Sequence, residues 1–225
     1  MKKNKNYPKL ICLIGIDGSG KTTVAKELVK KLKTNGINYK YAWVNNQPLL
    51  MYFIRFFWRI RLKSKGIKEY SKYKKEKSSL AQKKLIKKIY ELVHSFDYVL
   101  WVWLKVKLPL LLGKKIIVDR YYFDVAINFV LIDNYNDEKL LNKIKEYERW
   151  IPKPDVLFYI NISEETAFSR KDDIPDIEYL YERKKIYTRL AKKFNMIEIN
   201  GENSVNQVAT EIINNIQLSE KISDN

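Results

Sequence analysis

The sequence predicts an α/β fold, in which a five-stranded parallel sheet lies between two layers of helices. Five short apolar segments alternate along the chain with segments of helical periodicity. The first apolar segment is a run rather than an alternation, which is typical of a parallel strand covered on both faces. The 225 residues contain no internal repeat and no low-complexity linker, so we predict a single domain over residues 1–225.

A glycine-rich loop follows the first predicted strand, residues 10–14. Its pattern is Gly15-x-x-x-x-Gly20-Lys21-Thr22, and a helical pattern begins at its end. Glycines let successive backbone N–H groups point at phosphate oxygens, and the helix adds the positive end of its dipole. The lysine of such a loop reaches the β- and γ-phosphates, and the threonine hydroxyl binds Mg²⁺. The context predicts a P-loop NTPase fold, with ATP-binding residues Gly15, Asp17, Gly18, Ser19, Gly20, Lys21, Thr22 and Thr23.

The first helix and the second strand complete a βαβ unit. Residues 21–34 carry apolar side chains at four-residue spacing, which predicts an amphipathic helix. Asn35-Gly36 is a typical helix stop, and residues 37–44 then read as the second strand. A βαβ unit at the start of the chain implies parallel pairing.

Residues 47–112 form a predicted helical lobe between the second and third strands. Residues 49–62 are rich in aromatic residues and arginine, and helical periodicity runs from residue 80 toward Pro109. Residues 55–88 hold fourteen lysines or arginines against two glutamates, in a chain whose net charge is +17. Such a segment attracts polyanions, although a solvated basic face explains it equally well.

The third predicted strand ends in an acidic residue. Residues 115–121 are a short β-branched run that closes on Asp119-Arg120-Tyr121. A carboxylate at this place holds Mg²⁺ beside a phosphate-binding loop, often through water. Arginine pairs with phosphate through two parallel hydrogen bonds. A structural ion pair is the alternative explanation of the Asp-Arg pair.

The rest of the chain continues the alternation. Ser163 is a good N-cap for a helix that runs to about residue 170, and a short polar lid is predicted at about residues 170–176. The other predicted elements are helices 122–133 and 137–150, strand 155–160, helix 177–193, strand 195–200 and helix 204–218.

Composition points to a cytoplasmic protein. Cys12 is the only cysteine, so no disulfide can form within the chain. The start of the chain runs almost directly into the first strand, which leaves no room for a signal peptide. The most apolar stretch, residues 98–112, is interrupted by lysines and a proline and does not predict a membrane span. His94 is the only histidine and has no cysteine or second histidine to complete a metal site.

The order of motifs resembles the thymidylate kinase family of P-loop nucleoside monophosphate kinases over nearly the full chain. The matching segments are the loop at residues 15–23, the sequence Asp-Arg-Tyr-Tyr at 119–122, and Pro154-Asp155 before the fourth strand. Residues 164–170 are similar to the helix that leads into the family's lid. The resemblance implies the reaction dTMP + ATP to dTDP + ADP with Mg²⁺, and it implies a homodimer.

The resemblance also implies roles for single residues. Lys21 would stabilise the transferred phosphoryl group, and Thr22 and Asp119 would hold Mg²⁺, Asp119 through water. Arg120 would bind the acceptor phosphate, and Asp17 would face the acceptor sugar. Some family members place a catalytic arginine where this chain has Gly18, so the lid would supply that cation here. The candidates are Arg170 first, then Lys171 and Arg183.

Two departures from the family pattern fall on the acceptor side. The family's Thr-Arg-Glu-Pro after the second strand is Asn45-Asn46-Gln47-Pro48 here, so its arginine is lost. A second family arginine, which reads thymine, is absent from residues 96–99, where Tyr98 stands. The predicted acceptor-binding residues are Asp17, Arg55, Arg120, Tyr121 and Tyr98, with Arg59 and Arg61 as further replacements for the lost arginines.

Three functions therefore stay open at the level of sequence. The first is a thymidylate kinase-like enzyme. The second is a P-loop kinase for another acceptor, such as a deoxynucleoside or a larger phosphorylated molecule; a nucleoside acceptor needs a carboxylate base, for which Asp17 or Asp97 is available. The third is an NTP-binding core whose residues 49–88 dock on nucleic acid or an anionic membrane. The aromatic residues of that segment are equally suited to the core of the lobe.

Overall fold

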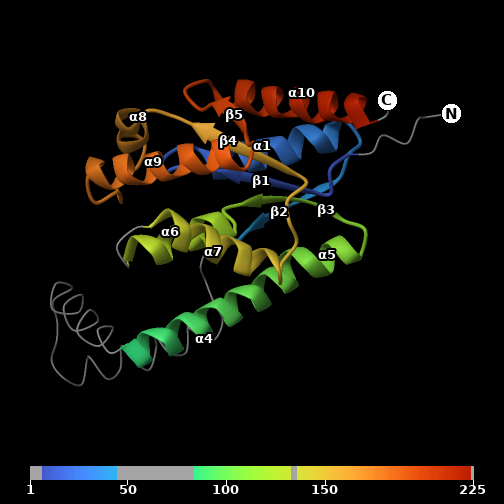
Figure 1. Ribbon diagram of the computed structural model, residues 1–225. Helices are drawn as coiled ribbons and strands as arrows, with labels where there is room; N and C mark the ends of the chain where they lie inside the picture. Colours follow the sequence, from blue (N-terminus) through green and yellow to red (C-terminus); the bar gives the residue numbers. More distant parts are fainter. Residues whose placement is uncertain (1–6, 45–83, 133–135, 224–225) are drawn as a thin grey trace, which may run out of the picture. The chain divides into compact units, whose positions relative to one another are not determined.

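The computed structural model describes residues 7–44, 84–132 and 136–223 (Figure 1). The chain divides into two compact units, one formed by residues 1–45 and 105–225 and the other by residues 46–104. The aromatic and arginine-rich stretch 49–62, with Arg55, Arg59 and Arg61, lies outside the described residues, as does Asn46.

The larger unit contains a five-stranded sheet in the order β2-β3-β1-β4-β5. Every neighbouring pair of strands is parallel. The predicted α/β fold is therefore confirmed. The strands are β1 (Leu10–Ile14), β2 (Tyr39–Trp43), β3 (Lys115–Asp119), β4 (Val156–Asn161) and β5 (Ile197–Asn200).

Burial follows the position of each strand in the sheet. All five residues of β1, the central strand, are buried, as the apolar run predicts. The edge strand β2 is buried only at Tyr39 and Ala42, and its other three residues are partly or fully exposed. The sequence thus distinguishes the centre of the sheet from its edge by composition alone.

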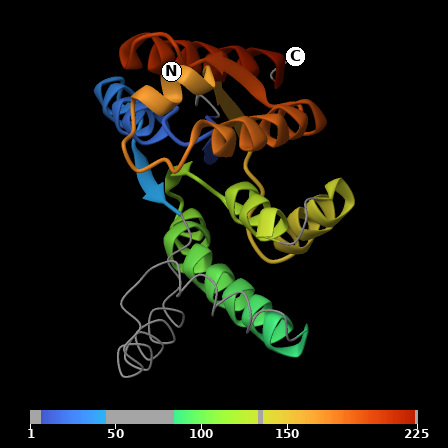
Figure 2. The ribbon, with the colours of Figure 1, turned by 90° about the vertical axis from the view of Figure 1, so that its left-hand side faces the viewer.

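Helices α1 (Lys21–Thr34) and α10 (Val205–Ser223) cover one face of the sheet. Both views show the two helices side by side (Figures 1 and 2). Alternate strand residues such as Ile11, Leu13 and Phe158 form one apolar core with Leu28 of α1 and Ile212 of α10. Because the four-residue spacing of α1 places its apolar side chains on this face, the helix holds the loop that precedes it against the sheet.

The opposite face carries aromatic residues from α6 (Tyr122–Ile132) and α9 (Ile177–Lys193). Tyr187 of α9 stacks on Tyr159 of β4 with ring centroids 6.4 Å apart. Phe123 of α6 meets Phe194, directly after α9, edge to face at 5.2 Å. Helix α7 (Asp137–Glu148) packs on α6, and α8 (Glu164–Ser169) packs on α9. The sheet thus has helices on both faces, as predicted.

In the smaller unit the described residues belong to one long helix. Helix α4 (Lys84–Val102) is followed by a π-helical turn, Trp103–Lys107, and by the short helix α5 (Leu108–Leu111). The helical periodicity expected toward Pro109 is confirmed from residue 84 onward. Across the described ranges, we find no helix with the length and apolar character that a membrane crossing requires.

Several element boundaries differ from the prediction, among them the start of the second strand and the end of the last helix. The second strand begins at Tyr39 rather than at residue 37, because Ile37 N–H donates to Leu32 O at 2.9 Å and Gly36 N–H to Lys33 O at 3.0 Å. These bonds close the end of α1, where Gly36 has φ 78°. The last helix extends to Ser223, past the predicted end at 218.

Candidate active site

The candidate site lies where β1 and β3 end. These strands are neighbours in the sheet, and Leu13 is in register with Asp119. Because both strands run in the same direction, the loop after Ile14 and the residues after Asp119 emerge at one edge. The topology therefore brings together two motifs that are about a hundred residues apart in the sequence.

Lys21 is folded onto its own loop. Its side chain is buried, and its Nζ donates to Gly15 O at 2.8 Å, Ile16 O at 2.6 Å and Ser19 Oγ at 3.1 Å. Burial and the charge of Arg120 lower the pKa of Lys21 to about 8, while neighbouring carboxylates oppose the shift. The ammonium group is thus paired with three oxygen atoms of its own loop, and it would have to leave them to bind a phosphate.

Gly18 brings the loop into direct contact with α8. Its φ is 83°, and a Cβ on Gly18 would meet the Ala167 carbonyl oxygen well inside contact distance. A side chain at this position would have to displace the backbone of α8. The structure therefore gives a steric reason for glycine at the place where some family members carry a catalytic arginine.

Thr22 and Asp119 meet at the N-terminal end of α1. The Thr22 hydroxyl donates to Asp119 Oδ2, which also accepts from Tyr41 OH at 3.1 Å. Asp119 Oδ1 is buried and has no hydrogen-bond partner among the residues that the structure describes. A buried carboxylate oxygen without a donor beside a threonine hydroxyl is a fitting pair of ligands for Mg²⁺. Burial and the Asp119 charge raise the pKa of Tyr41 to about 12, so this tyrosine stays a neutral donor.

Arg120 and Asp17 form an ion pair across the site. Arg120 has φ 63°, and its Nη2 binds Asp17 Oδ1. Burial raises the pKa of Asp17, but the charges of Arg120 and Lys21, with hydrogen bonds from Arg120 and Tyr179, outweigh it and hold that pKa well below its usual range. Burial likewise opposes the charge of Arg120, and the carboxylates of Asp124 and Asp17 outweigh it and raise its pKa. Both groups are therefore charged at neutral pH.

One face of α9 completes the network. Tyr179 OH donates to Asp17 Oδ2 at 2.9 Å, and the Arg183 guanidinium lies 4.3 Å from the Tyr179 ring centroid. Arg183 Nη2 donates to Asn128 Oδ1 at 2.7 Å, and Tyr187 OH to Asp124 Oδ1 at 2.6 Å. Sequence reasoning missed the roles of Tyr179 and Tyr187. Each of these tyrosines is four residues from Arg183, so the three residues share one helix face, and this spacing is the signal that could have found them.

The lid candidates lie in different surroundings. Arg170 Nη1 donates to Gly201 O at 3.2 Å, while Lys171 pairs locally with Asp173 at 2.9 Å. Gly201 follows β5, so its bond with Arg170 ties Arg170 to the end of that strand. Arg183 lies over the ring of Tyr179, which donates to Asp17.

The remaining predicted acceptor residues are Tyr121, Tyr98 and Arg55. Tyr121 is fully buried, and its hydroxyl donates to Pro152 O at 2.8 Å, which makes it a packing residue beneath Arg120. Tyr98 is buried on α4, in the smaller unit. Arg55 lies outside the described residues.

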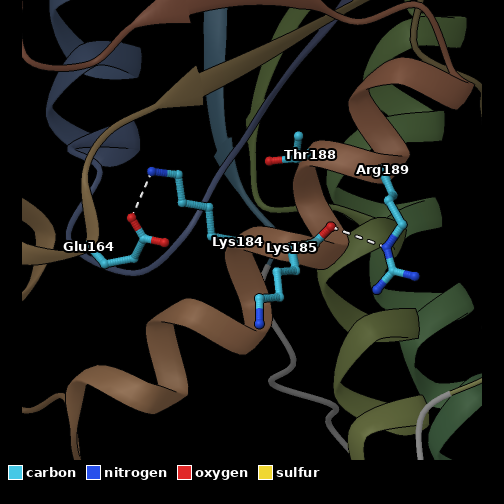
Figure 3. Close-up of a pocket in the computed structure, with 5 residues that line it drawn as sticks. All are labelled: Glu164, Lys184, Lys185, Thr188 and Arg189. Atoms are coloured by element: carbon cyan, nitrogen blue, oxygen red, sulfur yellow. Dashed lines mark hydrogen bonds and ion pairs between the residues drawn. The ribbon is translucent and has the colours of Figure 1, made fainter.

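Two pockets lie on the larger unit. One, of about 360 Å³, adjoins the phosphate-binding loop and is lined by Thr22, Thr23, Lys26, Glu27, Lys30 and Val205. The other, of about 480 Å³, lies along α9, where Lys184 pairs with Glu164 at 2.7 Å (Figure 3). Arg189 at its far end donates to the Lys185 carbonyl and pairs with Asp137. Of these two pockets, the first includes Thr22 of the phosphate-binding loop, whereas most charges that line the second are paired within the protein.

Comparisons with known proteins agree with this geometry. A family model described as thymidylate kinase matches residues 65–212. The chain is 28% identical to the thymidylate kinase of Plasmodium falciparum, over 96% of this chain and 93% of that protein. It is 26% identical to a probable thymidylate kinase of Sulfurisphaera tokodaii, over 92% and 94%, and 27% identical to the thymidylate kinase of Leptospira interrogans, over 94% of each chain. The family-model match begins after the phosphate-binding loop, so the loop geometry is independent support.

Proposed function

The chain belongs to the thymidylate kinase family, and from this premise we propose that it transfers the γ-phosphoryl group of ATP to dTMP. The observation that carries the proposal is the meeting of two clusters at one sheet edge. Lys21, Thr22 and Asp119 would form a site for a nucleoside triphosphate, and the Arg120–Asp17 ion pair lies beside it. A phosphate donor and a phosphate acceptor can therefore be held side by side.

On the donor side, we propose that Lys21 leaves its carbonyl partners and binds the β- and γ-phosphates. Thr22 and Asp119 would hold Mg²⁺, whose chemistry there is to neutralise charge on the β- and γ-phosphate oxygens. Tyr41 and Thr22 both donate to Asp119 Oδ2, so they fix the direction of Oδ1. The pocket beyond Thr23 offers room for the rest of the donor nucleotide.

On the acceptor side, Arg120 would bind the acceptor phosphate and Asp17 would face the sugar. An oxygen of that phosphate forms a bond to the γ-phosphorus, the bond from phosphorus to the β,γ-bridging oxygen breaks, and ADP leaves with the electron pair. The protein contributes alignment and positive charge rather than covalent chemistry. Binding by Arg120 requires that its guanidinium exchange Asp17 for phosphate.

We propose Arg170 as the cation of the lid that faces the transferred group, with Arg183 as the second candidate. Arg170 is the C-cap residue of α8, which Gly18 of the phosphate-binding loop approaches at Ala167, and Arg183 is linked to Asp17 through Tyr179. Arg170→Ala should lower kcat with little change in the KM for dTMP. The opposite pattern, with a normal kcat in Arg170→Ala and a low kcat in Arg183→Ala, would give the role to Arg183.

The deciding experiment is a coupled kinase assay with ATP and Mg²⁺ across the common nucleoside monophosphates and deoxynucleosides. We expect selective turnover of dTMP, which would mean that other residues replace the two lost family arginines. Turnover of a different acceptor would keep the kinase chemistry and overturn the proposed substrate. Lys33→Ala, an exposed lysine at the end of α1, is the matched control for Lys21→Ala.

Three finer points stay proposals. A homodimer follows from the family resemblance, and sedimentation at several protein concentrations tests it. Contact of residues 49–88 with nucleic acid or anionic membranes rests on charge alone, and absence of retention on DNA or anionic vesicles at physiological salt would remove it. A cytoplasmic location stays a prediction from composition.

A further inference from the structure

We propose that Asp124 and Tyr187 are positioning residues that hold the Arg120 guanidinium in place when it exchanges Asp17 for the acceptor phosphate. This inference rests on the proposed acceptor role of Arg120. Neither residue belongs to the phosphate-binding loop or to the Asp-Arg pair. Asp124 lies in the first turn of α6. Tyr187 is the last residue of the α9 face that Tyr179, Arg183 and Tyr187 form.

The two oxygens of Asp124 have different partners. Oδ2 accepts the Tyr121 N–H at 3.2 Å and so caps the start of α6. Oδ1 accepts from Tyr187 OH at 2.6 Å and lies 4.0 Å from Arg120 Nη1. Asp124 is 1% exposed and Tyr187 is 2% exposed, so bulk solvent does not hydrate the carboxylate oxygens of Asp124.

Helix capping by itself does not explain Oδ1. A capping carboxylate needs one oxygen for the backbone N–H, and its second oxygen normally remains in water at the helix surface. Here the second oxygen is buried and bonded to a buried hydroxyl that comes from another helix. A buried charge requires compensation, and the nearest cation in this network is Arg120.

The guanidinium thus has a separate carboxylate for each of its terminal nitrogens. Asp17 binds Nη2, and Asp124 lies toward Nη1. When a phosphate takes the Nη2 side, Asp124 stays on the other side, because it is fixed by Tyr121 and Tyr187. The guanidinium plane of Arg120, whose backbone has φ 63°, then keeps its orientation during the exchange.

The test compares Asp124→Asn and Tyr187→Phe with wild type. Asparagine keeps an oxygen for the Tyr121 N–H but loses the charge, and phenylalanine keeps the ring but loses the hydroxyl. We expect kcat/KM for dTMP to fall by about 10- to 100-fold in Asp124→Asn and less in Tyr187→Phe, while the KM for ATP stays within about twofold. Matched controls are Asp137→Asn at the exposed start of α7 and Tyr181→Phe, whose hydroxyl bonds Glu165 on α8.

A double-mutant cycle separates positioning from capping. If Asp124 acts through Arg120, Asp124→Asn should have no further effect on dTMP kinetics in an Arg120→Ala background. Full additivity, or a lower Tm with unchanged dTMP kinetics, would overturn the positioning role and leave only the cap. Unchanged dTMP kinetics in Arg120→Ala alone would overturn the proposed acceptor role of Arg120, and the positioning role with it. Calorimetric binding of dTMP without ATP gives a readout that is independent of turnover.

Discussion

Lys21 satisfies three oxygen atoms of its own loop, so its removal affects chemistry and loop order together. We expect Lys21→Ala to lower kcat by at least about 1,000-fold, because the charge that stabilises the transferred phosphoryl group is lost. The core between the sheet, α1 and α10 does not depend on the ammonium group, so a cooperative thermal transition should remain. Turnover within tenfold of wild type would contradict the proposed role of the loop.

The ion pair of Asp17 predicts how the free energy of unfolding changes at acid pH. Its pKa in the folded protein lies well below its usual range, through the balance described above. A depressed carboxyl pKa adds stability above the unfolded pKa of about 4, and this contribution is lost as the pH falls through the folded value. The free energy of unfolding of wild type should therefore exceed that of Asp17→Asn by roughly 1–3 kcal/mol between pH 5 and 7.

Urea denaturation at pH 7, 5, 4 and 3 measures this difference. It should shrink steadily below about pH 4, because the Asp17 carboxyl group of the unfolded chain takes up a proton there while that of the folded protein stays ionised. Asp137→Asn, at an exposed ion pair, serves as the control with a small difference at every pH. A difference between wild type and Asp17→Asn that is constant with pH would argue against the ion pair.

At this scale the sequence predicts the residues that carry a local pattern. Lys21 and Thr22 follow from the loop motif, and Asp119 and Arg120 from the end of a β-branched run. Tyr41 and Asp124 could not be predicted in the same way, because nothing near them in the sequence indicates their partners. Tyr41 meets Asp119 across neighbouring strands, and Asp124 meets a tyrosine 63 residues away.

Among the elements, the contact between the phosphate-binding loop and α8 offers a matched pair of variants. Gly18 and Gly36 have similar backbone angles, φ 83° and 78°, but only Gly18 faces a close backbone neighbour. Gly36→Ala should cost about 1–2 kcal/mol of unfolding free energy for the left-handed conformation alone. Gly18→Ala should cost more, because the Ala167 carbonyl must move, and it should also raise the KM for ATP.

Chemical denaturation of the two variants, with ATP kinetics beside it, gives the comparison. If Gly18→Ala and Gly36→Ala lost the same unfolding free energy, and Gly18→Ala kept the wild-type KM for ATP, the backbone of α8 would be able to move without measurable cost. The sequence predicts both elements, including the Ser163 cap, which accepts the Thr166 N–H. It could not predict their contact, because that depends on how the ends of β1 and β4 are aligned in the sheet.

For the molecule as a whole, the two substrate sites should be separable by ligand stabilisation. A ligand present at 100 times its dissociation constant stabilises the fold by about 2.7 kcal/mol. We expect a non-hydrolysable ATP analogue with Mg²⁺ and dTMP each to raise the Tm of wild type. In Lys21→Ala the shift caused by the analogue should fall sharply and the shift caused by dTMP should remain.

A loss of both shifts in Lys21→Ala would mean that donor and acceptor are not held by separate parts of the site. Global features of this kind follow from the sequence to different degrees. Alternating strands and helices predict the layered α/β fold, and parallel pairing follows from the βαβ start. The predicted acceptor residue Arg55 and the departure from the family pattern at residues 45–48 lie within residues 45–83, outside the part of the chain that the structure describes.

The Asp17–Arg120 pair means that the free enzyme already contains a competitor for its own acceptor. An inorganic anion that took Arg120 would strand a buried carboxylate, so bare phosphate or sulfate should be poor inhibitors. In the proposed reaction, dTMP would bring a phosphate for Arg120 and a sugar hydroxyl for Asp17, so both partners of the ion pair would be compensated at once. Recognition would then depend on the distance between the phosphate and the hydroxyl of the ligand, and smaller anions would be excluded.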